Sequence, residues 1–484
     1  MSIRSRLGEL IKNRRRNRGN VRPRVFRLAP QVELLESRRV LATVTLNTDM
    51  GLAGELRTEI ANAAPGETID FNLSAGNETI VLNGAMGSLL VDKELTIDGD
   101  NGAGSGVDVT ISGGDAVRVL TVDDLDAYTA VPVTLNNITI TGGQSSEGAG
   151  ILNAEDLTLS NATVTGNTAT SGAGGGIYSR GYGSALTLSY SAVDGNYATS
   201  YGPLAGGGIA TAVGALTIED STVSNNTATG TPGTFFAGGG IATTSNGASY
   251  TYGALDVTIS RSVISGNAVV GVEDAYQNGV NPYGGGFSGY GYGQVTIDDT
   301  TLSGNTAAGD VNGYQQAIGG GVSLWNNYAT MYASITNSTV TGNMSTNRAG
   351  GIGVYTSFYY DYGSYSSISN GYIELSIAGT TISDNTTNYY GGGMWVSSGD
   401  AHATVQITES TISGNTANSS GGLTNWNSYV TIDSSEISNN AAISDAGFQY
   451  GGGVTNYGLF LDYAGYATPT MIISNSTISG NSTT

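Results

Sequence analysis

The chain has 484 residues, with 74 glycines, 8 prolines, no cysteine and a formal net charge of −21. This length predicts several domains or a repeat array rather than one compact core. The absence of cysteine excludes disulfides and thiolate metal sites, the acidic balance argues against a nucleic-acid partner, and without a run of 18 apolar residues no transmembrane span is expected.

The charge divides the chain into a basic leader and an acidic body. Residues 1–43 carry a net charge of +9 and the remainder carries −30. We expect residues 1–43 to be a disordered leader or export segment. A basic tail without a targeting role is the alternative, because no apolar stretch of the kind found in signal peptides follows Arg14–Arg16.

Val32–Ala42 (VELLESRRVLA) resembles the LEPR-XLL element of large exported planctomycete proteins. The matching positions are Leu35, Glu36, Arg38, Val40, Leu41 and Ala42, and Ser37 stands where proline is usual. The resemblance implies export, and hence an extracellular protein or one associated with the cell surface or outer membrane.

Residues 44–132 are expected to form an N-terminal cap and the first coils of the repeat. Leu56, Ile60 and Ala63 are spaced to form one face of a short amphipathic helix, and strand-like segments follow it. The region from Glu55 to Val122 resembles the CSLREA-type start of bacterial β-helix proteins, although its Cys-Ser is missing. The resemblance implies a helix that covers the open end of a stacked sheet.

From Val133 to Thr484 the chain repeats one unit, of which Gly206–Asn226 is an example. A Gly-Gly-aliphatic segment is followed by two inward aliphatic residues five positions apart, such as Ile218 and Val223, and this pair recurs eleven times. An asparagine stands three residues after the second aliphatic in ten copies, whereas the remaining copy has Gly143. These asparagines are Asn167, Asn196, Asn226, Asn267, Asn305, Asn343, Asn385, Asn415, Asn440 and Asn481.

The repeats predict an all-β fold, a single-stranded right-handed parallel β-helix of the pectate-lyase type with three short strands per coil and some thirteen or fourteen coils. The alternation within each strand indicates burial of one face, while the interval between copies varies from 24 to 42 residues, as free connecting loops allow. Stacking places the asparagines in one column, where their side-chain amides can hydrogen-bond to one another. Asparagine also tolerates the left-handed backbone conformation of a sharp corner. We interpret the column as a structural ladder.

Two acidic corners are the candidate catalytic positions, because β-helix folds often carry polysaccharide lyases and hydrolases. They are Glu219-Asp220 and Asp298-Asp299, with Asp220 and Asp299 expected two coils apart. The alternative is a surface charge ladder in which Arg261, from the coil between them, neutralises the acids. The acidic loops could also bind Ca²⁺, although no cofactor is expected and no metal ligands are assigned.

Tyrosines gather in the variable arms, and they can either stack on sugar rings or pack over the coils. Examples are Tyr290, Tyr292, Tyr359, Tyr360, Tyr362, Tyr365, Tyr389, Tyr390, Tyr457 and Tyr463. Surface glycans or other cell-surface proteins are therefore the expected partners.

The pairing of GG-x-[ILV] with aliphatic-x-x-Asn over residues 133–484 resembles the repeats of chlamydial polymorphic outer membrane proteins. Gly207-Gly208-Ile209 and Val223–Asn226 show the match, with Val or Ile where that family has Phe. We expect an exported or cell-surface β-helix protein with a structural or adhesive role and without catalytic activity. A carbohydrate-active enzyme, a polysaccharide lyase or glycoside hydrolase, on the same fold is the alternative.

Overall fold

The computed structural model divides the chain into two units, Met1–Val40 and Leu41–Thr484, and the second contains every element described below. The LEPR-XLL-like positions before Ala42 therefore lie outside the described residues. The structure describes residues 42–74, 78–100, 109–126, 129–181, 183–200, 204–212, 214–230, 236–245, 253–271, 283–309, 317–327, 329–356, 360–361, 366–367, 371–398, 403–443, 451–458 and 469–484.

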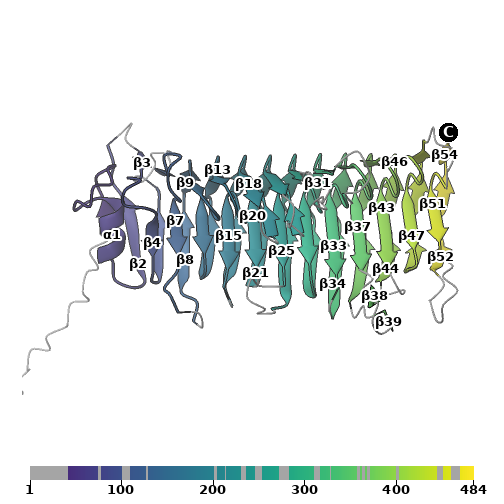
Figure 1. The fold of residues 1–484 in the computed structure, drawn as a ribbon, viewed down its shortest axis with the longest axis horizontal. Helices are drawn as coiled ribbons and strands as arrows, with labels where there is room; N and C mark the ends of the chain where they lie inside the picture. Colours follow the sequence, from purple (N-terminus) through teal and green to yellow (C-terminus); the bar gives the residue numbers. More distant parts are fainter. Residues whose placement is uncertain are drawn as a thin grey trace, which may run out of the picture. The chain divides into compact units, whose positions relative to one another are not determined.

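The second unit is a parallel β-helix, as the repeats predict. Four long, all-parallel sheets run through the described residues, and from β8 onwards successive strands of a coil enter the four sheets in turn (Figure 1). Sheet 1 contains β1 (Ala42–Val44), β2 (Glu67–Phe71), β5 (Leu95–Asp98), β8 (Pro132–Asn136), β12 (Asp156–Ser160), β16 (Ala185–Ser189), β21 (Gly214–Glu219), β26 (Leu255–Ser260), β30 (Gly293–Asp298), β34 (Thr330–Thr336), β40 (Tyr372–Ala378), β44 (Ala403–Thr408), β48 (Tyr429–Asp433) and β52 (Thr470–Ser474).

Sheet 2 follows sheet 1 across a corner, such as Asp220-Ser221 after β21. It contains β3 (Thr79–Val81), β6 (Val109–Ser112), β9 (Ile138–Thr141), β13 (Thr163–Thr165), β17 (Ala192–Asp194), β22 (Thr222–Ser224), β27 (Val263–Ser265), β31 (Thr301–Ser303), β35 (Thr339–Thr341), β41 (Thr381–Ser383), β45 (Thr411–Ser413), β49 (Glu436–Ser438) and β53 (Thr477–Ser479).

Sheet 3 begins directly after the asparagine column. It contains β10 (Gln144–Ser145), β14 (Thr168–Ala169), β18 (Tyr197–Ser200), β23 (Thr227–Gly230), β28 (Ala268–Gly271), β32 (Thr306–Ala308), β36 (Met344–Ser345), β42 (Thr386–Thr387), β46 (Thr416–Ala417), β50 (Ala441–Ala442) and β54 (Ser482–Thr483).

Sheet 4 begins at the aliphatic residue of the Gly-Gly-aliphatic segments. It contains β4 (Leu89–Val91), β7 (Leu120–Val122), β11 (Ile151–Asn153), β15 (Ile177–Arg180), β20 (Ile209–Ala212), β25 (Ile241–Thr244), β29 (Phe287–Tyr290), β33 (Val322–Asn326), β37 (Ile352–Thr356), β43 (Met394–Ser398), β47 (Leu423–Trp426) and β51 (Val454–Tyr457).

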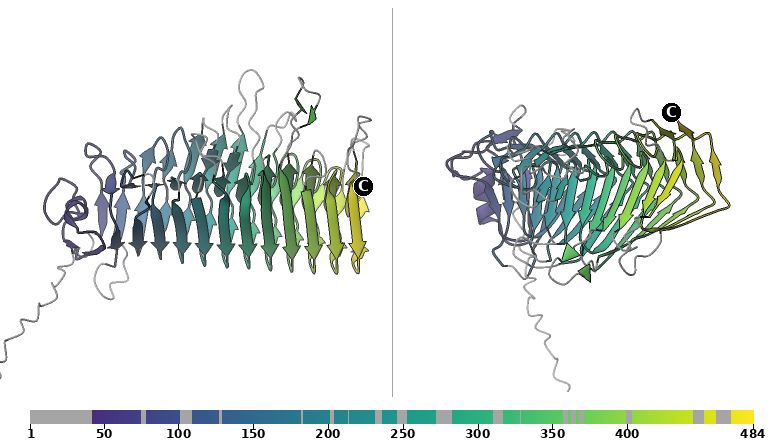
Figure 2. Two further views of the ribbon diagram at one scale, coloured as in Figure 1. Left: turned by 90° about the horizontal axis from the view of Figure 1, so that it is seen from below. Right: turned by 45° about the vertical axis from the view of Figure 1, so that its right-hand side comes forward.

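Two small sheets lie in the connecting arms. β19 (Leu204–Gly206) pairs in parallel with β24 (Phe236–Gly238), and β38 (Tyr360–Asp361) pairs antiparallel with β39 (Ser366–Ser367). Figure 2 shows the second pair standing away from the four long sheets. The arms that vary in length therefore leave the stacked coils unchanged.

The core lies between the sheets, and each of its recurring positions holds a large apolar residue in most coils. In the coil that begins at β20, Ile209, Leu216, Ile218 and Val223 are all fully buried. Each packs on its equivalent in the next coil, because the registers align Ile209 with Ile241 and Val223 with Ile264. The predicted inward aliphatic positions therefore form the core of the fold, except in the eleventh copy, where Ile473 and Ile478 are 37% and 51% exposed.

The expectation of three strands per coil fits the described strands before β8, but it is wrong from β8 onwards, where sheet 3 adds a fourth strand to the coil. Sheet 3 was missed because its strands have two to four residues and its inward positions hold small side chains instead of large aliphatic ones. The inward residues Ala198, Ala228 and Ala307 are fully buried. Short segments with alanine at the inward position show almost no hydrophobic periodicity, so the sequence pattern predicts a loop there instead of a strand.

A short helix, α1 (Leu56–Asn62), lies at the N-terminal end of the sheets (Figure 1), as predicted. Its residues Leu56 and Ile60, and Ala63 just after it, are buried as part of the main core. The predicted apolar face therefore closes one end of the stack. In the described part of the chain no helix is long and apolar enough to cross a membrane.

Candidate functional site: corners, asparagine column and aromatic row

The acidic corners lie on one line along the coils. The register aligns Glu219 with Ser260 and Ser260 with Asp298, so Asp220, Arg261 and Asp299 occupy the same corner of three successive coils. All three have φ between 46° and 49°, the left-handed conformation that a two-residue turn requires. Asp220 and Asp299 are therefore two coils apart, with Arg261 between them.

Arg261 binds both acids of the Glu219-Asp220 corner. Its Nε and Nη2 donate to the two carboxylate oxygens of Asp220 at 2.9 and 3.0 Å, and Nη2 also donates to Glu219. The hydrogen bond from Arg261 lowers the pKa of Asp220 below its ordinary value. This arrangement matches one half of the charge ladder expected from the sequence, the part that joins Arg261 to the Asp220 corner; between Arg261 and Asp299 the described residues show no ion pair.

The second acidic corner is also hydrogen-bonded. Asp298 accepts hydrogen bonds from Thr336 Oγ1 and from Asn337 Nδ2, the latter at 3.0 Å, and these lower its pKa. Asp433 makes the same pair of contacts, with Ser474 and Asn475 of the next coil. An aspartate at the end of a sheet 1 strand thus ties its coil to the following one.

The asparagine column forms a continuous hydrogen-bonded ladder from Asn167 to Asn481. Each Oδ1 accepts both the backbone N–H and the Nδ2–H of the asparagine one coil earlier, at 2.9–3.0 Å. Nδ2 also donates to a backbone carbonyl, as from Asn226 to Val193 O at 2.9 Å. The ladder begins at the exceptional copy, where Gly143 N donates to Asn167 Oδ1.

The left-handed backbone expected at the column lies one residue earlier. Gly195, Asn225 and Gly266 have positive φ, whereas the column asparagines that follow them do not. The preceding residue makes the turn, and the asparagine then points its amide into the coil. The column is therefore selected for the side-chain amide rather than for tolerance of a strained backbone.

The Gly-Gly segments pack directly on this ladder. A Cβ added to Gly208 would lie 2.8 Å from the amide of Asn226 and 2.9 Å from Gly240 O. The same contacts recur at Gly240 and Gly286. Glycine is needed there because the backbone of one sheet approaches the asparagine side chain of the same coil, which is a packing requirement rather than a phosphate-binding one.

Three acidic residues outside these corners come together near β12. The carboxylates of Asp123, Asp124 and Glu155 offer oxygens that lie within 4.8 Å of one another. Burial raises the pKa of Glu155, and the charge of Asp124 adds to this shift. The two carboxylate oxygens of Glu155 accept hydrogen bonds from Asp124 N and Val131 N, which oppose the shift without cancelling it. The spacing matches a cation site, yet the two backbone donors by themselves account for the burial of this carboxyl group.

An aromatic row follows the outer face of sheet 4. Its members Tyr290, Trp325, Tyr355, Trp426 and Tyr457 share one outward position, three residues after the aliphatic residue that begins each strand, and Ser397 holds that position between Tyr355 and Trp426. Ring centroids are 4.9 Å apart for Tyr290 and Trp325 and 5.9 Å apart for Trp325 and Tyr355. Tyrosines but not the tryptophans were singled out from the sequence, although an apolar residue stands three positions before an aromatic one in five copies.

The first part of the row is covered by the connecting arms. Tyr290 is 4% exposed, and Tyr283 packs on Trp325 with ring centroids 5.0 Å apart. Beside the row, Arg348 lies 4.9 Å from the ring centroid of the buried Trp395, which aligns with Thr424 of the next coil rather than with a row member. Burial lowers the pKa of Arg348. Here the rings pack over the coils, which was one of the two roles expected for the arm aromatics. Of the predicted tyrosines, Tyr359, Tyr362, Tyr365 and Tyr463 lie outside the described residues, as do the side chain of Tyr360 and the single His402.

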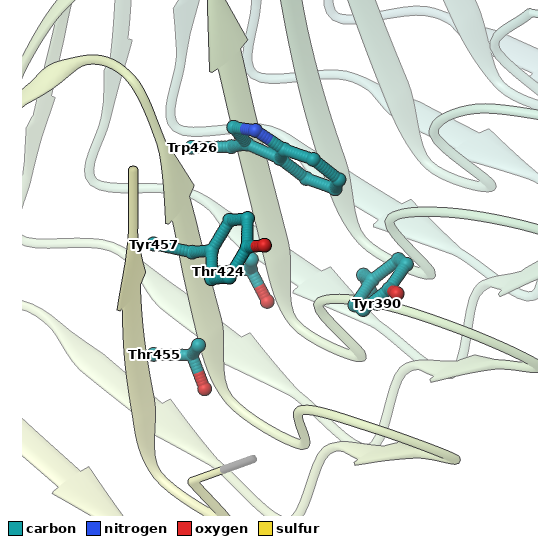
Figure 3. A pocket seen from close by; sticks show the side chains of 5 residues that line it. All are labelled: Tyr390, Thr424, Trp426, Thr455 and Tyr457. Carbon is teal, nitrogen blue, oxygen red and sulfur yellow. The ribbon is translucent and has the colours of Figure 1, made fainter. Parts of the chain in front are cut away.

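The last part of the row opens into a pocket. Five side chains from β47, β51 and the arm before β43 surround a partly open cavity of about 60 Å³ (Figure 3). They are Tyr390, Thr424, Trp426, Thr455 and Tyr457. Tyr457 is 39% exposed and Trp426 partly exposed, so aromatic surface is accessible here, unlike at the buried Tyr290.

The chain was compared with family models, curated proteins and solved structures. No family model matches it, and no curated protein or solved structure shows significant similarity.

Proposed function

We propose that this chain is an exported or cell-surface β-helix protein with a structural and adhesive role. The proposal includes the resemblances of its leader to the LEPR-XLL element, of its first coils to the CSLREA-type start and of its repeats to those of polymorphic outer membrane proteins. In this view the hydrogen-bonded coils are a rigid scaffold, and residues outside the fixed positions bind the partner, a surface glycan or another surface protein.

The aromatic row on sheet 4 is the observation that carries the adhesive role. Aromatic side chains supply large contact area at low entropic cost and are enriched at binding surfaces. The row occupies one outward position on sheet 4, and its last members, Trp426 and Tyr457, remain accessible. The scaffold holds these rings at a strand spacing of about 4.8 Å, which pre-organises them for a repetitive ligand.

The corner acids support an enzymatic function less well. General acid–base catalysis requires a carboxyl group that exchanges its proton near the working pH, whereas hydrogen bonds lower the pKa of both Asp220 and Asp298. Asp220 is also bound on both oxygens by Arg261.

Two experiments test the proposal with the full chain. Fractionation of the producing cells, with sequencing of the mature N-terminus, should find the protein outside the cytoplasm. Labelled protein should bind a cell surface or members of a glycan array. Retention in the cytoplasm, or the absence of binding to every surface and glycan tested, would overturn the corresponding part of the proposal.

A further inference from the structure

We infer that the cavity lined by Tyr390, Thr424, Trp426, Thr455 and Tyr457, here called the Trp426 pocket, is a subsite for one neutral pyranose ring of a glycan. The inference deepens the proposed adhesive function and rests on it. It specifies where on the aromatic row the ligand binds and which class of sugar it contains.

The walls of the pocket are aromatic and differ from the covered part of the row. Trp426 meets Tyr390 with ring centroids 5.8 Å apart and Tyr457 with centroids 5.2 Å apart, at interplanar angles of 80° and 78°. Ser397, which precedes Trp426 in the row, brings no ring. A pyranose presents a C–H face that packs on an aromatic surface of this kind, and concave sites with aromatic linings are typical small-ligand sites.

One of the residues that line the pocket, Thr424, has a buried hydroxyl group without a hydrogen-bond partner in the described part of the chain. Thr424 is 1% exposed, and its Oγ1 has no hydrogen-bond partner among the described residues. The neighbouring Thr455 Oγ1 is already engaged, by Ser420 Oγ and by Gly451 N, each at 3.0 Å. A buried hydroxyl without a partner is costly and uncommon, and a ligand hydroxyl at the pocket would satisfy it.

The charge of the site favours a neutral ligand over an acidic one. None of the five lining residues is an acid or a base that is charged near neutral pH. The body of the chain carries −30, which repels polyanions such as uronate polymers. The lining itself offers no cationic side chain to pair with a bound carboxylate.

The geometry also favours a sugar over a quaternary ammonium group. An ammonium cage directs several ring faces at one cation, whereas here the rings pack edge to face on each other. An ammonium group would also leave the Thr424 hydroxyl without a partner. The cavity is shallow enough to take one face of a single ring while the rest of a glycan chain remains outside.

The test measures binding of the purified full chain to neutral gluco-, manno- and galacto-oligosaccharides, to uronate oligosaccharides and to choline by isothermal titration calorimetry. Two variants alter the pocket. Trp426→Ala removes the central wall, and Thr424→Val removes the hydroxyl while keeping the shape of the side chain. Tyr332→Ala is the matched control, because Tyr332 is an aromatic residue that is 54% exposed on sheet 1. Circular dichroism confirms that each variant is folded.

We expect at least one neutral oligosaccharide to bind the unmodified chain. Trp426→Ala should weaken this binding about tenfold or more, as loss of one stacking ring does, and Thr424→Val should weaken it about fivefold. Tyr332→Ala should leave it unchanged.

Three results would overturn the inference. If neutral glycans bind but folded Trp426→Ala and Thr424→Val bind equally well, the subsite is wrong while the adhesive proposal stands. If uronates or choline bind and lose affinity with Trp426→Ala, the ligand class is wrong. If the chain binds neither glycans nor cells, both the subsite and the adhesive proposal fail.

Discussion

Asn226 and Asn267 occupy the same corner of adjacent coils, and Asn267 Oδ1 accepts both the backbone N–H and the side-chain amide of Asn226, each at 3.0 Å. Asn267 in turn donates from Nδ2 to Val223 O and to Asn305 Oδ1. One side chain thus satisfies donors and acceptors of three successive coils where no water reaches them, since Asn267 is fully buried. The ladder makes each coil depend on its neighbours.

Replacing a central member of this ladder should destabilise the stack strongly. Asn267→Ala leaves the N–H of Asn226 and the carbonyl of Val223 buried without these partners. We expect a loss of about 2–4 kcal/mol, because each unsatisfied buried group costs about 1–3 kcal/mol. The measurement is the urea midpoint followed by circular dichroism. Asn72→Ala, at an exposed asparagine that follows β2, should leave the midpoint unchanged, and an equal effect at both positions would contradict the ladder's role.

A methyl group at a glycine directly before a sheet 4 strand should have a comparable effect for a steric reason. The Cβ of Gly240→Ala would lie 2.8 Å from Gly286 O and 2.9 Å from the Asn267 amide. Neither atom can withdraw without breaking the ladder, so we expect a loss of about 1–3 kcal/mol, as for overpacking elsewhere. Gly84→Ala is the control, since its Cβ would meet nothing closer than 3.7 Å. Thermal unfolding that is equally affected in both variants would exclude the steric explanation.

The N-terminal cap should depend on pH through Glu55. Burial by itself raises the pKa of Glu55, but hydrogen bonds from Thr48 Oγ1, Leu52 N and Met50 N outweigh it, so the pKa is lowered. A carboxyl group with a lowered pKa in the folded state stabilises that state above its unfolded pKa of about 4.3, and this contribution is lost as pH falls through the folded pKa.

The measurement is hydrogen exchange of the amides of Met50 and Leu52 between neutral and acidic pH. We expect their protection to fall on acidification in the unmodified chain. In Glu55→Gln protection should already be low at neutral pH, with a loss of about 1–3 kcal/mol in the cap and little further change in acid. Protection that is independent of pH in the unmodified chain would show that the carboxylate does not hold the cap.

Loss of the Arg261 side chain should change the pKa of Asp220 rather than the stability of the protein. Because the hydrogen bond from Arg261 lowers the pKa of Asp220, Arg261→Gln should raise it towards the ordinary value for aspartate. Stability at neutral pH should change little, since both side chains are on the surface. The measurement is NMR titration of the carboxyl carbons. Asp433 serves as an internal control, because Ser474 and Asn475 rather than an arginine lower its pKa. If the pKa of Asp220 is the same in Arg261→Gln as in the unmodified chain, Arg261 does not control it.

Local sequence patterns predict much of this fold. Alternating residues such as Leu216 and Ile218 predict a strand buried on one face, and their recurrence in every copy predicts the parallel register, because a slip of one residue would expose the whole set. The helix at Leu56–Asn62 was likewise predicted from the spacing of its apolar residues. The column of asparagines was visible for the same reason, since one residue type recurred at one position.

The tertiary structure decided the features that depend on neighbouring coils. The alanine strands of sheet 3 have no local signal, because Ala228 is buried by what surrounds it rather than by its own hydrophobicity. The need for glycine at Gly208 arises from Asn226, eighteen residues away in the sequence and in contact only once the coil has closed. The pocket depends on three segments, since Tyr390, Trp426 and Tyr457 come from different coils. The sequence by itself determined the scaffold, because scaffold positions repeat. A binding site occurs once, so only the contacts made on folding reveal it.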